Sequence, residues 1–244
     1  MATLFAQIGM ESKLFLRDRR SLFFTFAFPL IMVIIFGSAF GDQAVSGSTA
    51  INFLLPGITV MAVMMVAMSN NVVKIAADRE KGIYRRLSLT PLKRQTLVTS
   101  QVIVRLLIVF ASALLLAAVG ITMFKANFSG NWLLAMAVLT IGSLTFTSLG
   151  FILSSLVGNA SGAMPLCMAV LFPMMFLGGC FWNLDQLPSL MRQIASVLPT
   201  THLNNALRLI SQGAGPGQVW SELPVVLGWL AGSSVLAVKF FKWE

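Results

Sequence analysis

The sequence has little charge and few histidine, tyrosine or cysteine residues. Only 10% of its 244 residues are charged, whereas soluble domains carry about 25%. By contrast, 57% of the residues are hydrophobic, which is typical of a membrane protein. The net charge is +9, but the basic residues lie between apolar stretches and form no basic face with base-reading residues. A nucleic-acid partner is therefore not expected.

The scarcity of reactive groups excludes several enzyme classes. His202 is the only histidine, so a multi-histidine metal site cannot form. A nucleotide-binding P-loop needs Gly-Lys followed by Ser or Thr, and no lysine here has such neighbours. The Gly-x-Ser-x-Gly motif of many hydrolases is also missing. Cys167 and Cys180 lie in one apolar run, about 20 Å apart along a helix, and cannot pair within it. We expect neither a catalytic site nor a cofactor in this chain.

Six apolar segments are long enough to cross a bilayer, which takes about 20 apolar residues in a helix. The sixth is the least regular, because Glu222 and Pro224 fall in its first turns. Charged residues precede the first segment, so it is expected to stay in the mature protein rather than act as a cleaved signal. We predict an all-α polytopic membrane protein with one transmembrane domain, 1–244. The predicted spans are about 22–41, 53–73, 97–120, 132–157, 163–182 and 219–238.

The distribution of Lys and Arg predicts the orientation of these spans. With six spans, the segments on the side of the N-terminus hold thirteen Lys and Arg, and those on the other side hold three. Positive residues concentrate on the cytoplasmic side, so both termini are expected there. Arg105 remains, inside the third span. It is either an anchoring residue that reaches the membrane surface or a functional intramembrane charge.

Two segments outside the spans have helical periodicity. In residues 1–21, Leu4, Ile8 and Phe15 share one face, with Glu11 elsewhere; this predicts a helix lying along the membrane surface, with a solvated tail as the alternative. Residues 183–218 predict an external re-entrant hairpin of two short helices. Pro199 is expected to end the first of them, and the second carries an apolar stripe up to Ile210.

The segment 74–96 has seven of the Lys and Arg residues and a short helical pattern. Gly82 precedes the pattern and Pro91 ends it, and Ile83, Tyr84 and Leu87 share one face. A helix of about 12 Å is marginal alone. It either docks in a groove on a partner or touches only lipid headgroups. If it docks, an acidic residue in place of Leu87 is expected to abolish binding.

The residues of this segment resemble a known pattern. Glu80-Lys81-Gly82 followed by Leu87, Thr90, Pro91 and Leu92 resembles the cytoplasmic loop of ABC-2 type permeases, the transmembrane subunits of ATP-binding-cassette transporters. The stretch LPTTHLNNALRLI, 198–210, is similar to the segment before their last span. The resemblance covers nearly the whole chain, and the most similar subgroup is that of daunorubicin and multidrug exporter permeases.

The resemblance implies a homodimer of two such chains with two ATPase subunits, which would hold ATP and magnesium, in a bacterial cytoplasmic membrane. It also assigns an ATPase-coupling role to the segment. Ile83 departs from the Thr of many relatives. The coupling residues are Glu80, Gly82, Ile83, Tyr84, Arg85, Arg86, Leu87, Thr90 and Pro91.

The substrate is expected to be hydrophobic or amphiphilic: a drug, an antibiotic or a lipid. One alternative is a lipid-linked glycan, although Tyr84 is the only tyrosine and stacking aromatics for a sugar are few. An alternative of another class is a membrane scaffold or sensor subunit that transports nothing.

Overall fold

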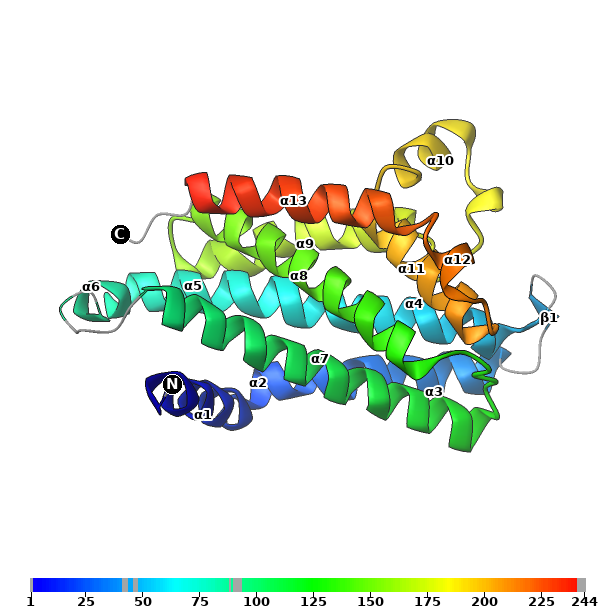
Figure 1. Cartoon of the computed structure of the whole chain (residues 1–244), viewed down its shortest axis with the longest axis horizontal. Helices are drawn as coiled ribbons and strands as arrows, with labels where there is room; N and C mark the ends of the chain where they lie inside the picture. The colour runs from blue at the N-terminus through cyan, green and yellow to red at the C-terminus, as the bar shows by residue number, and fades with distance from the viewer. Residues whose placement is uncertain (1, 41–43, 46–47, 88, 90–93, 241–244) are drawn as a thin grey trace.

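The computed structural model describes residues 2–40, 44–45, 48–87, 89 and 94–240. The protein is a bundle of long helices (Figure 1). Apart from one β-hairpin with two residues in each strand, its regular elements in these ranges are helical. Five helices are long and apolar enough to cross a membrane, and Leu223–Lys239 is a shorter apolar helix. The five are Arg19–Phe40, Ala50–Glu80, Gln95–Phe124, Trp132–Leu156 and Ala160–Leu177.

The elements follow one another with short connections. The β-hairpin pairs Ala44 with Thr49 and Val45 with Ser48 in antiparallel register. The elements are α1 (Ala2–Arg17), α2 (Arg19–Leu22), η1 (Phe23–Ala27), α3 (Phe28–Phe40), β1 (Ala44–Val45), β2 (Ser48–Thr49), α4 (Ala50–Met64), η2 (Met65–Ser69), α5 (Asn70–Glu80), α6 (Ile83–Leu87), α7 (Arg94–Phe124), α8 (Trp132–Leu156), α9 (Ala160–Leu177), η3 (Leu184–Gln186), α10 (Ser189–Ala195), α11 (Pro199–Ser211), α12 (Pro216–Val219) and α13 (Leu223–Phe240).

The second long helix is the centre of the bundle. It runs through α4, the π-helical turn η2 and α5, and 78% of its most apolar window is buried, against 22% for the first long helix and 28% for the fifth. Buried Ile58, Met61 and Met68 form much of the core. The helix does not end with the predicted span at residue 73, because it continues through polar residues to Glu80. Lys74 stays inside the bundle by pairing with Glu11 of α1.

Helix α1 and the end of α13 lie at the same end of the bundle (Figure 1). We call it the α6 end, since α1 and α6 lie there, and α10, α11 and the strands lie at the opposite, α11 end. The sixth predicted span corresponds to the shorter helix α13, which begins at Leu223 rather than 219. Glu222 comes just before α13 and contacts His202, with 2.6 Å between the carboxylate and Nδ1.

Residues 183–218 contain the two predicted short helices, α10 and α11. Pro199 was expected to end the first of them, but α10 already ends at Ala195 and Pro199 begins α11, as suits a proline in a first helical turn. Leu203, Ala206 and Ile210 of the predicted stripe are buried. In the shorter helix α10, by contrast, the apolar residues Leu190, Met191 and Ile194 are exposed.

Residues 2–17 form the predicted helix, but its apolar face packs partly against the protein. Leu4, Ile8 and Phe15 are half-buried rather than exposed, and α1 packs mainly along α7. Glu11, predicted to lie away from the apolar face, is only 8% exposed. Phe5, at 70%, is among the most exposed apolar side chains of α1.

Candidate functional site

Gly82 makes the turn between the central helix and α6. Its φ of +64° is a left-handed conformation that glycine adopts without a Cβ penalty. The turn closes where the amide of Gly82 donates to the carbonyl of Arg79 over 2.9 Å. The amide of Arg86 donates to the Gly82 carbonyl over 3.2 Å, so α6 starts directly after the turn. The break expected at Gly82 is confirmed.

The residues before this turn hold the connection between α8 and α9. Arg79 donates from Nη1 to the carbonyl of Ser154, at 3.0 Å, near the carboxyl end of α8. The Glu80 carboxylate accepts from the amide of Ala160, at 2.8 Å, where α9 begins. Both contacts match the partial charges of helix ends, which are negative at carbonyls and positive at amides. The side chain of Glu80 is thus engaged within this chain.

Tyr84 fixes α6 against the bundle. It is only 8% exposed, and its hydroxyl shares a hydrogen bond with the side chain of Gln101 on α7. Burial raises the pKa of Tyr84 to about 12, the Asp78 carboxylate adds to the rise and the Gln101 hydrogen bond opposes it. Ile83 is half-buried. The face of α6 with Ile83 and Tyr84 therefore packs on this chain.

The exposed face of α6 is basic. Arg85 and Arg86 are exposed, and Nη2 of Arg86 donates to the carbonyl of Lys81 over 2.7 Å. Leu87 contributes its backbone to the last turn of α6. Thr90 and Pro91, the other predicted coupling residues, lie outside the described residues.

The sequence did not predict a polar network that lies next to α6. Arg105 is 6% exposed and donates from Nη2 to Oδ1 of Asn71 over 2.6 Å. Asn71 donates in turn to the carbonyl of Thr147 over 3.1 Å. One turn further along α5, Lys74 pairs with Glu11 of α1. Only the residue types were visible in the sequence, because these partners lie 34 to 76 positions apart.

The Ala-Leu-Arg stretch of α11 anchors that helix. Arg208 donates from Nη2 to the Gly179 carbonyl over 2.7 Å, and its guanidinium lies 3.6 Å from the ring centroid of Phe53. Burial lowers the pKa of Arg208 to about 10, although that value still leaves it charged near neutral pH, and the nearby Cys180 opposes the shift. Asn204 also donates to the Gly179 carbonyl, at 2.7 Å. This part of the hairpin is therefore packed against the bundle.

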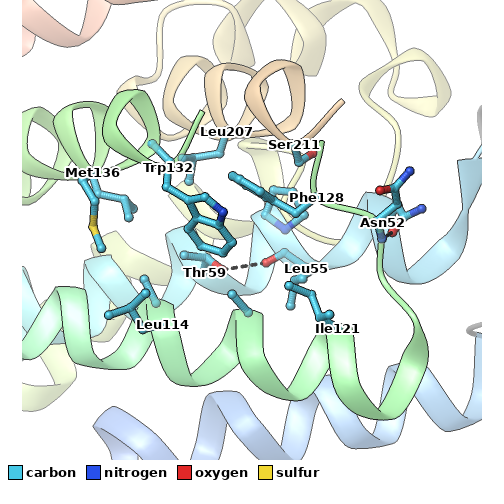
Figure 2. Close-up of a pocket in the computed structure, with 16 residues that line it drawn as sticks. Asn52, Leu55, Thr59, Leu114, Ile121, Phe128, Trp132, Met136, Leu207 and Ser211 are labelled. Carbon is cyan, nitrogen blue, oxygen red and sulfur yellow. Dashed lines mark hydrogen bonds between the residues drawn. The ribbon is translucent and has the colours of Figure 1, made fainter. Parts of the chain in front are cut away.

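A small apolar pocket lies near the α11 end, between α4, α7, α8 and α11 (Figure 2). Its volume is about 70 Å³, whereas sites for drug-sized ligands measure roughly 300–1,000 Å³. The rings of Phe128 and Trp132 lie at one side, with centroids 4.1 Å apart. Thr59 Oγ1 donates to the Leu55 carbonyl of its own helix at 2.8 Å (Figure 2). The pocket has room for a few methyl groups, not for a whole amphiphile.

These features together define a polytopic helical membrane protein with a short basic helix at one end. The chain belongs to the ABC-2 type transporter family, whose profile matches residues 4–211. The matched domain is the membrane permease, which lacks an ATPase site.

Several transport proteins are distant relatives of this chain. Over 222 residues the chain is 26% identical to the daunorubicin resistance ABC transporter permease protein DrrB1 of Streptomyces coeruleorubidus, covering 88% of this chain and 76% of the relative. It is 29% identical over 196 residues to ABC transporter G family member 20 of Dictyostelium discoideum, covering 78% of this chain but only 27% of that protein. It is 22% identical over 191 residues to the probable multidrug ABC transporter permease YbhR of Escherichia coli (strain K12), covering 78% of this chain and 52% of the relative.

Proposed function

We propose that this chain is the membrane subunit of an ABC exporter that moves a hydrophobic or amphiphilic compound outward, driven by ATP hydrolysed on a separate subunit. Membership of the ABC-2 family supports a transporter. The relatives named as daunorubicin resistance and multidrug permeases support an amphiphilic compound. ATP and magnesium would be held by the partner, because the sequence has no P-loop.

The observation that carries the proposal is the way α6 is attached. Its tip presents exposed Arg85 and Arg86, which suit pairing with carboxylates of a partner. Its base is joined to α5 through Gly82, and Arg79 and Glu80 bind the ends of α8 and α9. A displacement of α6 by an ATPase would therefore act on three spans at once.

In the proposed assembly the α6 end faces the cytoplasm of a bacterial cell, with both termini on that side. The Lys and Arg excess of thirteen to three supports this orientation. Two copies of the chain would pair, each carrying one ATPase subunit. The first and fifth long helices support such pairing, because only 22% and 28% of their most apolar windows are buried within one chain.

The decisive experiment is ATP-dependent accumulation in inside-out vesicles that contain the chain and its ATPase. Candidate drugs, lipids and a lipid-linked glycan would each be offered. The variant Arg85→Glu reverses one charge at the tip of α6, and Lys125→Glu makes the same change at an exposed position after α7, at the α11 end.

We expect accumulation of an amphiphile, with ATPase binding weakened in Arg85→Glu and retained in Lys125→Glu. Equal ATPase binding by both variants would contradict docking at α6. Uptake of the glycan alone would favour the glycan exporter. If an ATPase binds but no compound accumulates, the scaffold or sensor alternative gains support.

A further inference from the structure

A cavity with a polar lining lies at the α6 end, bounded by α1, α2, η1, η2, α5, α7 and α9. Its volume is about 390 Å³, within the range of about 300–1,000 Å³ of ligand sites. It is therefore large enough for a lipid headgroup and the first part of a chain, in contrast to the pocket in Figure 2.

Arg105 supplies a buried cationic group to this cavity. The side chain lines it and is 6% exposed. One of its nitrogens, Nη2, donates to Asn71, but Nε has no acceptor among the described residues. Buried polar groups are nearly always hydrogen-bonded. A guanidinium with an unused donor in a cavity is thus prepared for an anion, phosphate above all.

Asp78 supplies a group of the opposite sign to the same cavity. Its carboxylate has neither a hydrogen bond nor an ion pair with a described residue, although the cations Lys74, Lys81 and Arg105 and the carboxylate of Glu11 are within electrostatic reach. The carboxylate is half-buried, so it is ready to accept hydrogen bonds from a ligand ammonium group.

The other charged side chains that line the cavity are either paired within the protein or exposed to solvent. Glu11 is paired with Lys74. The Asp18 carboxylate accepts from the amide of Arg20 at 3.1 Å and from the hydroxyl of Ser21 at 2.6 Å. Lys81 and the Arg20 side chain are exposed. Four cations and three anions line the cavity, so its charge is mixed rather than simply basic.

The lining changes from polar to apolar along the bundle. Asp78 and Lys81 lie at the end of the central long helix, where headgroups meet a protein. Met65, which also lines the cavity, is about 20 Å deeper along the helix. Met164 and Met168 of α9 line the cavity as well, and flexible methionines adapt to a lipid chain.

We propose that this cavity binds a phospholipid with a zwitterionic headgroup that carries a primary ammonium. The phosphate lies at Arg105, the ammonium at Asp78, and the start of the acyl chain lies along Met65 and Met168. A primary ammonium is preferred over a quaternary one because only the primary group donates hydrogen bonds to a carboxylate. The proposal goes beyond export and holds whether or not the bound lipid is also the cargo.

The test is lipid titration of the full-length purified chain, read by native mass spectrometry. The probes are phosphatidylethanolamine, phosphatidylcholine and phosphatidylglycerol with identical acyl chains, together with water-soluble phosphoethanolamine. We expect phosphatidylethanolamine to bind about tenfold more tightly than the other two lipids, a ratio that corresponds to about 1.4 kcal/mol. Phosphoethanolamine should bind far more weakly than the lipid, because it lacks the chain.

Two variants separate the roles of the charged groups, and one provides the control. Asp78→Asn should abolish the preference for phosphatidylethanolamine over phosphatidylglycerol while both still bind. Arg105→Gln should weaken the binding of all three lipids. Lys125→Gln, which lies at the distant α11 end, should leave lipid binding unchanged. If Arg105→Gln does not fold, Asp78→Asn decides alone. Equal binding of the three lipids, an unchanged preference in Asp78→Asn, or phosphoethanolamine binding as tight as the lipid would each overturn the proposal.

Discussion

At the scale of single residues, Tyr84 offers a direct measure of how α6 is packed. It is the only tyrosine in the chain, so the absorbance of tyrosinate reports on it alone. Burial raises its pKa to about 12, while an unfolded tyrosine has a pKa near 10. We expect the absorbance change of the folded protein near pH 12 and that of the denatured protein near pH 10. A folded-state midpoint near 10 would show that α6 does not bury Tyr84.

The same shift has a consequence for stability. The folded state holds the phenolic proton more tightly than the unfolded state, so the stabilisation is complete below pH 10 and is lost as the pH rises through 12. Tyr84→Phe removes the titrating group and serves as the control. Its unfolding free energy should change less between pH 9 and pH 12 than that of the unmodified chain, which a denaturant titration at both pH values would measure.

The pair of Glu11 and Lys74 gives a second prediction at this scale. Glu11→Gln leaves the partly buried ammonium without the carboxylate it contacts, and we expect a loss of about 1–3 kcal/mol in unfolding free energy. Unfolding in sodium dodecyl sulfate measures it. The double variant Glu11→Gln with Lys74→Gln should lose less than the sum of the two single variants. Strict additivity would mean that the pair contributes no coupling.

Residues such as these mark the limit of what the sequence predicts. The excess of basic residues in 74–96 was visible, as was the intramembrane Arg105. Their partners were not visible, because Glu11 and Lys74 meet only after α1 folds back on the bundle. For the same reason the sequence assigned Glu80 to coupling without showing that its side chain accepts from the amide of Ala160.

At the scale of elements, Gly82 determines the direction of α6. Apart from its chain neighbours, no described residue has an atom within 4 Å of the position that a Cβ would take there, so a substitution acts mainly through the backbone. Gly82→Ala should cost about 1–2 kcal/mol, because alanine disfavours the left-handed conformation. Amide hydrogen exchange in residues 83–87 should then be about tenfold faster.

Asparagine provides the matched comparison at this position. It tolerates the left-handed conformation better than alanine, so Gly82→Asn should exchange at a rate between those of the unmodified chain and Gly82→Ala. Equal rates in all three proteins would show that the turn does not control the order of α6.

Element boundaries were predicted well where hydrophobicity alone decides them. The fourth span, predicted as 132–157, is Trp132–Leu156. Errors arose where a helix continues through polar residues. The central helix extends to Glu80 because α1, α7, α8 and α9 supply partners for its polar end. Hydropathy cannot report such partners.

At the scale of the whole molecule, the native cysteines allow a clean test of orientation. Cys167 and Cys180 are fully buried, and burial raises the pKa of the Cys180 thiol to about 12. A membrane-impermeant maleimide reacts with thiolates, so it should leave both unlabelled. An introduced cysteine at an exposed position would then be labelled without background.

Two exposed positions at opposite ends of the bundle complete this test: Lys13 on α1 and Gln193 on α10. We expect labelling of Gln193→Cys in intact cells, and of Lys13→Cys only after the membrane is opened, because the basic α6 end should face the cytoplasm. The reverse pattern would mean that the orientation is wrong. Labelling of both in intact cells would contradict the placement of these two helices on opposite sides of the membrane, and with it the docking of a cytoplasmic ATPase on α6.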